Sequence, residues 1–202
     1  MGADAIETDV QLTADGEPVL FHDSRVDRTS NGRGPVASHS LDELRRLDIG
    51  SWYGGDAGPQ RVLTLQEMLD DYAPRIPIVF EIKDPRATGS TMASLSGVLG
   101  ACEVTSFSWG ALLDARRTAP TATLGFLTPI FDADIIHRIA AAGFQQVCPN
   151  VDTLTADLVQ AAREADLIVR AYGIRTRRDI ERLFSSGADG ATVNWPQWIP
   201  AR

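Results

Sequence analysis

The run Ala5-Ile6-Glu7-Thr8-Asp9-Val10, near the start of the 202-residue chain, has the length and the branched apolar content of a β-strand. Successive side chains of a strand point to opposite faces, so Glu7 and Asp9 share one face. A turn follows at residues 13–16, and residues 18–21 predict a short strand that returns along the first. We therefore expect a small hairpin and loop insertion over residues 11–62, standing on the end of a sheet.

The rest of the chain alternates short apolar runs with helical patterns, which favours a parallel sheet covered by helices. The expected strands of this sheet are residues 5–10, 76–82, 104–107, 122–127, 144–149, 167–172 and 190–193. The expected helices are residues 41–47, 65–72, 111–118, 133–142, 156–165 and 178–186, and Thr64 with Glu67 forms a capping-box pattern before the second of them.

Seven such strands are one short of the eight in a TIM-type barrel. An open doubly wound sheet is the alternative, but no GxGxxG motif follows a strand. We expect an α/β fold, a TIM-type (β/α)8 barrel that lacks its first strand and helix, as a single domain over residues 1–202. Residues 1–4 read as the end of a helix, so we expect either that the native start lies upstream or that the chain is a fragment.

The composition predicts one sizeable core, since 44% of the residues are hydrophobic and 23% are charged. A net charge of −8 argues against nucleic acid or an anionic membrane as the main partner. No stretch approaches the roughly 18 apolar residues of a membrane span. We expect a cytoplasmic location, unless an upstream segment carries a signal peptide. Cys102 and Cys148 have no metal-binding spacing and are expected to be buried thiols.

Polar residues at the ends of two consecutive strands form the predicted site. Glu81 and Lys83 share a face at the end of residues 76–82, just as Glu7 and Asp9 do on the first strand. Barrel enzymes build their sites at these C-terminal ends. Three converging carboxylates repel one another unless a cation intervenes, and Mg²⁺ and Ca²⁺ both suit oxygen ligands. A single acidic residue there would be read as a surface salt bridge, whereas two pairs on neighbouring strands favour function.

His22 ends the returning strand of the hairpin and is expected above the same carboxylates. A histidine in that place can deliver a proton to a leaving alkoxide near neutral pH. On its own, it would equally well be a hydrogen-bonded turn residue. Lys83 is placed to meet a phosphate oxygen.

These residues resemble the signature of the glycerophosphodiester phosphodiesterases. The resemblance is most specific over residues 2–32, which include the run Phe21-His22-Asp23, and continues with Glu81-Ile82-Lys83, Ala171-Tyr172-Gly173 and Gly187-Ala188-Asp189-Gly190. It weakens between about Arg86 and Ala101, where this chain looks shortened.

The resemblance implies a TIM-type barrel that hydrolyses small-molecule glycerophosphodiesters to an alcohol and glycerol 3-phosphate. It implies Glu7, Asp9 and Glu81 as ligands of one divalent cation, His22 as a catalytic histidine, and Lys83 as a substrate or phosphate contact. Tyr172 sits where the family usually carries an active-site tryptophan.

The family's opening strand, which ends in His-Arg-Gly, is absent from this sequence, so we expect weak or absent activity. The absence of this strand also leaves two open sheet edges that could pair with a second copy of the chain. Two alternatives stay open: a related phospholipase-like barrel phosphodiesterase, and a non-catalytic remnant that binds a phosphodiester or a protein.

Overall fold

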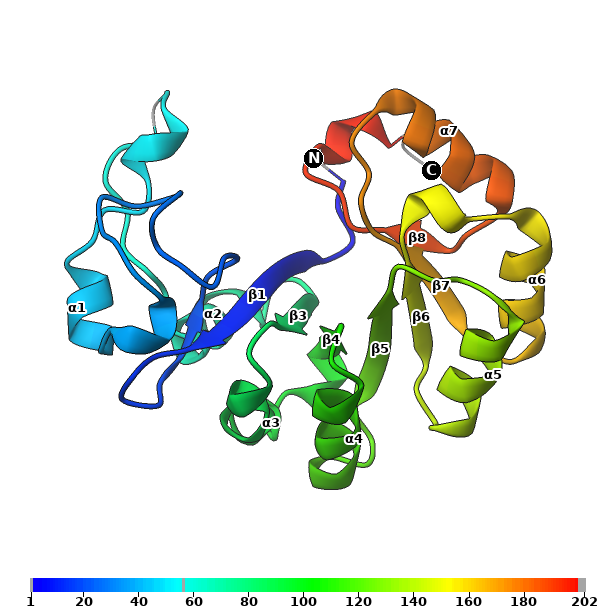
Figure 1. Ribbon diagram of the computed structural model, residues 1–202, viewed down its shortest axis with the longest axis horizontal. Coiled ribbons are helices and arrows are strands. Elements are labelled where there is room, and N and C mark those ends of the chain that lie inside the picture. Colours follow the sequence, from blue (N-terminus) through cyan, green and yellow to red (C-terminus); the bar gives the residue numbers. More distant parts are fainter. Residues whose placement is uncertain (1, 56, 200–202) are drawn as a thin grey trace.

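The computed structural model describes residues 2–55 and 57–199, in which eight strands form one curved sheet (Figure 1). The strands are β1 (Ile6–Leu12), β2 (Pro18–Leu20), β3 (Ile78–Ile82), β4 (Cys102–Ser106), β5 (Thr123–Thr128), β6 (Gln146–Pro149), β7 (Ile168–Ala171) and β8 (Gly190–Ala191). Their spatial order is β2-β1-β3-β4-β5-β6-β7-β8. All neighbouring pairs are parallel except β1 with β2, which is the predicted hairpin.

Helices follow the strands and lie along the outer side of the curve (Figure 1). They are α2 (Leu65–Tyr72), α3 (Thr88–Leu95), α4 (Trp109–Thr118), α5 (Ala133–Ala141), α6 (Ala156–Glu164) and α7 (Arg177–Ser186), while α1 (Leu41–Arg45) lies in the loop insertion. The predicted capping box is confirmed at α2: the Thr64 hydroxyl accepts from the Glu67 amide, and the Glu67 carboxylate accepts from the Thr64 amide. The parallel, chain-ordered sheet with external helices confirms the predicted TIM-type arrangement.

The two faces of the sheet differ in polarity. Side chains that point towards the helices are apolar and fully buried, such as Phe80, Val104 and Leu124. Side chains on the concave face include Glu81 and Gln146, which are also buried. A polar concave face is unusual for the centre of a barrel, which is normally filled by branched apolar side chains. The sheet therefore turns hydrogen-bonding and ionisable groups towards its inner side.

One helix was missed by the sequence prediction. Helix α3 occupies the stretch that looks shortened relative to the family. Its buried face consists of Thr88, Thr91, Met92 and Leu95, so two of the four core positions are threonines. With Gly89 and two serines also present, the helical period was not visible in the hydrophobic pattern.

The loop insertion has a small core of its own. Val19, Phe21, Val26, Val36, Leu44 and Val62 are buried together, apart from the cluster beneath the sheet. This second core stabilises the insertion at the C-terminal end of β1. Across the described residues, no helix has the length and apolar character needed to cross a bilayer.

The described strands do not close into a ring, because β8 pairs with β7 but with no second strand among residues 2–55 and 57–199. One edge of β1 pairs with β3. In the described chain, the other edge pairs only with β2, from Val10 to Leu12. Strand β3, in contrast, has a partner on each side.

We expect this difference to appear in hydrogen exchange. Amides of residues 190–193 should exchange much faster than those of Ile78–Ile82, because an unpaired edge opens without breaking a ladder on both sides. Mass spectrometry on a monomeric sample, with β5 as an internal reference, measures this. Strong protection of residues 190–193 in a monomer would mean that another segment covers this edge.

Candidate active site

The predicted carboxylates meet on the concave face of the sheet. Strands β1 and β3 are neighbours, and the register places Asp9 opposite Glu81 and Glu7 opposite Val79. One carboxylate oxygen from each of Glu7, Asp9 and Glu81 lies within 4.8 Å of the other two. The convergence expected from the spacing in the sequence is therefore confirmed.

Lys83 lies directly against two of these carboxylates. Its Nζ is 2.6 Å from Oε1 of Glu81 and 3.2 Å from Oδ1 of Asp9, and its side chain is 22% exposed. One ammonium thus faces three carboxylates, which leaves net negative charge in a partly buried space. The cluster remains attractive to a further cation.

Burial and mutual repulsion perturb the ionisation of this cluster. Burial, followed by the charges of Asp9 and Glu81, raises the pKa of Glu7 to about 7. Burial also raises the pKa of Glu81, although Lys83 and His22 oppose it. For Lys83, burial works to lower the pKa, but the contacts with Glu81 and Asp9 outweigh it and the pKa rises. A carboxyl pKa near 7 is typical of functional sites, and a bound cation would favour the ionised carboxylate there.

One buried carboxylate oxygen of the cluster is paired with Lys83. Oε1 of Glu81 lies 2.6 Å from Nζ of Lys83 and has no other hydrogen-bonding partner in the described structure. A carboxylate oxygen can take a second polar contact. Three carboxylates that share one ammonium fit a hard divalent cation with oxygen ligands. Glu7, Asp9 and Glu81 therefore form a candidate divalent-cation site.

His22 stands at the end of the hairpin, on the same side as the carboxylates. The amide of the preceding Phe21 donates to the carbonyl oxygen of Asp9 at 2.9 Å, which ties the end of β2 to the strand that carries two of the carboxylates. The His22 side chain is 65% exposed, and its Nδ1 lies 2.7 Å from Oδ1 of Asp23. The imidazole is thus accessible to a ligand.

Tyr172 follows β7 and joins the rim of the site through Phe107. The two rings meet edge to face at a centroid distance of 5.3 Å. Nζ of Lys83 lies 5.9 Å from the centroid of the Phe107 ring. Tyr172 and Lys83 are therefore linked by one intervening aromatic ring, Phe107.

Arg170 was not predicted as part of this region. It donates to Oγ1 of Thr192 at 2.6 Å and to Oε1 of Gln146 at 3.3 Å. Its charge lowers the pKa of Glu7, although burial of Glu7 has the larger and opposite effect. Its position two residues before Tyr172, in the expected strand 167–172, was a usable signal, because such residues share a face.

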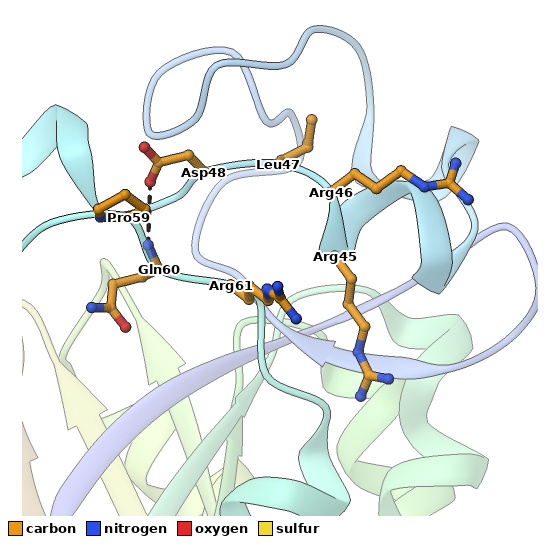
Figure 2. Close-up of a pocket in the computed structure, with 7 residues that line it drawn as sticks. All are labelled: Arg45, Arg46, Leu47, Asp48, Pro59, Gln60 and Arg61. Carbon is orange, nitrogen blue, oxygen red and sulfur yellow. Dashed lines mark hydrogen bonds between the residues drawn. The ribbon is translucent and has the colours of Figure 1, made fainter.

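A cavity of about 550 Å³ lies elsewhere, in the loop insertion, and Figure 2 shows its lining. Arg45 and Arg46 extend in different directions, and Oδ1 of Asp48 accepts from the Gln60 amide. Arg45 is also paired with Glu67 at 2.6 Å. Because the guanidinium groups do not converge, this cavity lacks the chemistry of the carboxylate cluster.

Comparison with known proteins decides the family. The glycerophosphoryl diester phosphodiesterase family matches residues 1–197. The chain belongs to this family. The glycerophosphodiester phosphodiesterase of Caldanaerobacter subterraneus is 28% identical over 207 residues, covering 98% of this chain and 85% of that protein. The Bacillus subtilis protein YhdW is 30% identical over 210 residues, covering 98% and 86%.

A solved structure gives the same assignment. A phosphodiesterase of Oleispira antarctica, described in complex with the product sn-glycerol-3-phosphate, has a TM-score of 0.86 and 26% identity, covering 97% of this chain and 83% of that one. The family resemblance, which is most specific over residues 2–32, and the TIM-type fold that it implies are therefore confirmed. The roles of individual residues are taken up as proposals below.

Proposed function

We propose that this chain hydrolyses glycerophosphodiesters to an alcohol and glycerol 3-phosphate, with one divalent cation held by Glu7, Asp9 and Glu81. The observation that carries the proposal is the convergence of these three carboxylates with Lys83 at the C-terminal ends of neighbouring strands. Family membership and the glycerol 3-phosphate complex of the Oleispira antarctica relative support the substrate class.

A bound Mg²⁺ or Ca²⁺ would polarise the phosphoryl group and balance the charge that develops on it. Lys83 contacts a phosphate oxygen from the side of β3. Tyr172 and Phe107 form an aromatic wall for the glycerol or alcohol portion.

The reaction replaces the phosphorus–oxygen bond to the alcohol by a bond to a water oxygen. When His22 acts it is protonated at both ring nitrogens: the proton on Nε2 goes to the departing alkoxide, so that the alcohol leaves neutral, and the ring is left protonated at Nδ1. The proton that the attacking water loses passes to solvent, from which Nε2 is protonated again. The exposure of His22 suits this role, because the leaving group must reach solvent.

Hydrolysis of glycerophosphocholine tests the proposal. We expect release of choline and glycerol 3-phosphate that requires Mg²⁺ or Ca²⁺ and stops with a chelator. His22→Asn should lower kcat by about 10²- to 10⁴-fold, the usual contribution of one positioned proton donor. His137→Asn, an exposed histidine on α5, is the matched control and should leave kcat unchanged.

The products also separate the alternatives. Release of phosphocholine and glycerol would indicate a phospholipase C-like reaction. Binding of the diester without turnover under any cation would favour a non-catalytic protein, and equal activity in His22→Asn would remove His22 from the mechanism.

A further inference from the structure

Asp23 is held between His22 and Arg28. Its Oδ1 lies 2.7 Å from Nδ1 of His22. Nε of Arg28 donates to Oδ2 of Asp23 at 2.6 Å, and Nη2 of Arg28 donates to Oδ1 at 2.9 Å. The carboxylate is therefore fixed by a two-point contact on one side and contacts the imidazole on the other.

Arg28 is itself held by Trp52, from a later part of the loop insertion. Its guanidinium carbon lies 5.7 Å from the centroid of the Trp52 ring, within cation–π range. The indole N–H of Trp52 donates to the carbonyl oxygen of Ile49 at 2.8 Å, which fixes the ring. A continuous set of contacts therefore leads from Ile49 and Trp52, through Arg28 and Asp23, to His22.

The charge state of Asp23 determines what His22 can do. The hydrogen bonds from Arg28, helped by His22, hold the pKa of Asp23 far below its usual range. An ionised carboxylate accepts hydrogen bonds and cannot donate them. Nδ1 of His22 must then carry the proton that it shares with Asp23, and Nε2 is left to face a ligand.

We propose that Asp23 and Arg28 are positioning residues that hold His22 in the tautomer protonated at Nδ1 and aim Nε2 at the substrate. This inference rests on the proposed function for its catalytic meaning. The plain alternative is a surface ion pair, and exposed pairs contribute little to stability. Such a pair would leave both the tautomer of His22 and the catalytic rate unaffected when removed.

The tautomer is measured by nitrogen NMR of the full chain with labelled histidine, at about pH 8.5, where an ordinary imidazole is neutral. His39→Gln and His137→Gln assign the remaining signal to His22. We expect wild-type His22 to be protonated at Nδ1, and Asp23→Asn to shift the population towards protonation at Nε2. Arg28→Gln should produce a smaller shift in the same direction. Arg25→Gln is the control, since Arg25 pairs with Asp27 in the same loop at 3.2 Å and has no contact with His22 among the described residues.

The glycerophosphocholine assay gives a second readout. Asp23→Asn should lower kcat at least about tenfold while KM stays within about twofold, because orientation of the proton donor acts on the chemical step. Arg25→Gln should leave both unchanged.

A wild-type His22 protonated at Nε2, or a tautomer that does not respond to Asp23→Asn and Arg28→Gln, overturns the proposal. Absence of hydrolysis in the wild-type chain would instead refute the proposed function, and the NMR result would still decide the positioning of His22.

Discussion

We expect Glu81→Ala to abolish divalent-cation binding and to lower kcat/KM for glycerophosphocholine by at least about 1,000-fold. That factor corresponds to roughly 4 kcal/mol of transition-state stabilisation, a reasonable share for a bound cation. Glu81 is the most buried of the three carboxylates; it is opposite Asp9 in the strand register and lies against Lys83. Its loss removes one of the three carboxylates that would hold the cation.

Calorimetry with Mg²⁺ and with Ca²⁺ measures this, and we expect about one site per wild-type chain. Glu103→Ala is a matched control. Glu103 lies on the adjacent strand β4 and is not one of the three clustered carboxylates; its carboxylate accepts a hydrogen bond from Gln146 at 2.7 Å. Cation affinity equal to the wild type in Glu81→Ala would refute the carboxylate site.

We expect the metal-free protein to lose stability as the pH rises from about 4.5 to about 7. The pKa of Glu7 is about 7 in the folded chain and 4.5 when unperturbed, so the folded state binds the proton more tightly. Below this window the carboxyl is protonated in both states, and above it the carboxylate is ionised in both. Within the window, unfolding releases a proton and becomes easier as the pH rises. The total loss is roughly 3 kcal/mol, since one pKa unit corresponds to about 1.36 kcal/mol.

Urea unfolding in the presence of a chelator, across this window, measures the slope. Glu7→Gln should flatten it and should make the metal-free protein more stable than the wild type at about pH 8, because no charge is then buried. Glu181→Gln, which removes the same charge from an exposed position on α7, should leave the slope intact. Adding the cation should raise the stability of the wild type but should not raise that of Glu7→Gln. A flat profile for the metal-free wild type would contradict the raised pKa of Glu7.

The central cluster was predictable because it depends on rules that act locally. Two residues two apart on a strand share a face, and the ends of consecutive parallel strands meet at one edge, so Glu7, Asp9, Glu81 and Lys83 had to converge once the strands were recognised. The hairpin was predictable for the same reason, since the turn at residues 13–16 separates two short apolar runs.

Other features depend on contacts that a sequence does not state. Helix α3 was missed because threonines occupy core positions that the hydrophobic pattern assigns to apolar residues. The contact of Arg28 with Asp23 depends on how a long loop turns back on itself. The sequence of the loop does not show where it turns. The roles of His22, Lys83 and Tyr172 stay predictions, because geometry alone places them at the site without testing their chemistry.

The order of the strands in space has a consequence for how the protein is made. Every parallel neighbour of a strand is also the next strand along the chain, with only the hairpin strand β2 placed outside this series. From β3 to β8, paired residues are 20 to 24 positions apart in the sequence, whereas Asp9 and Glu81, which pair between β1 and β3, are 72 positions apart. The pairing that builds the site therefore has the highest loop-closure cost among the parallel pairs. All three carboxylates and Lys83 lie within the first 83 residues, on two strands that pair with each other. During synthesis, the complete set of candidate cation ligands is therefore translated before the last five strands of the sheet.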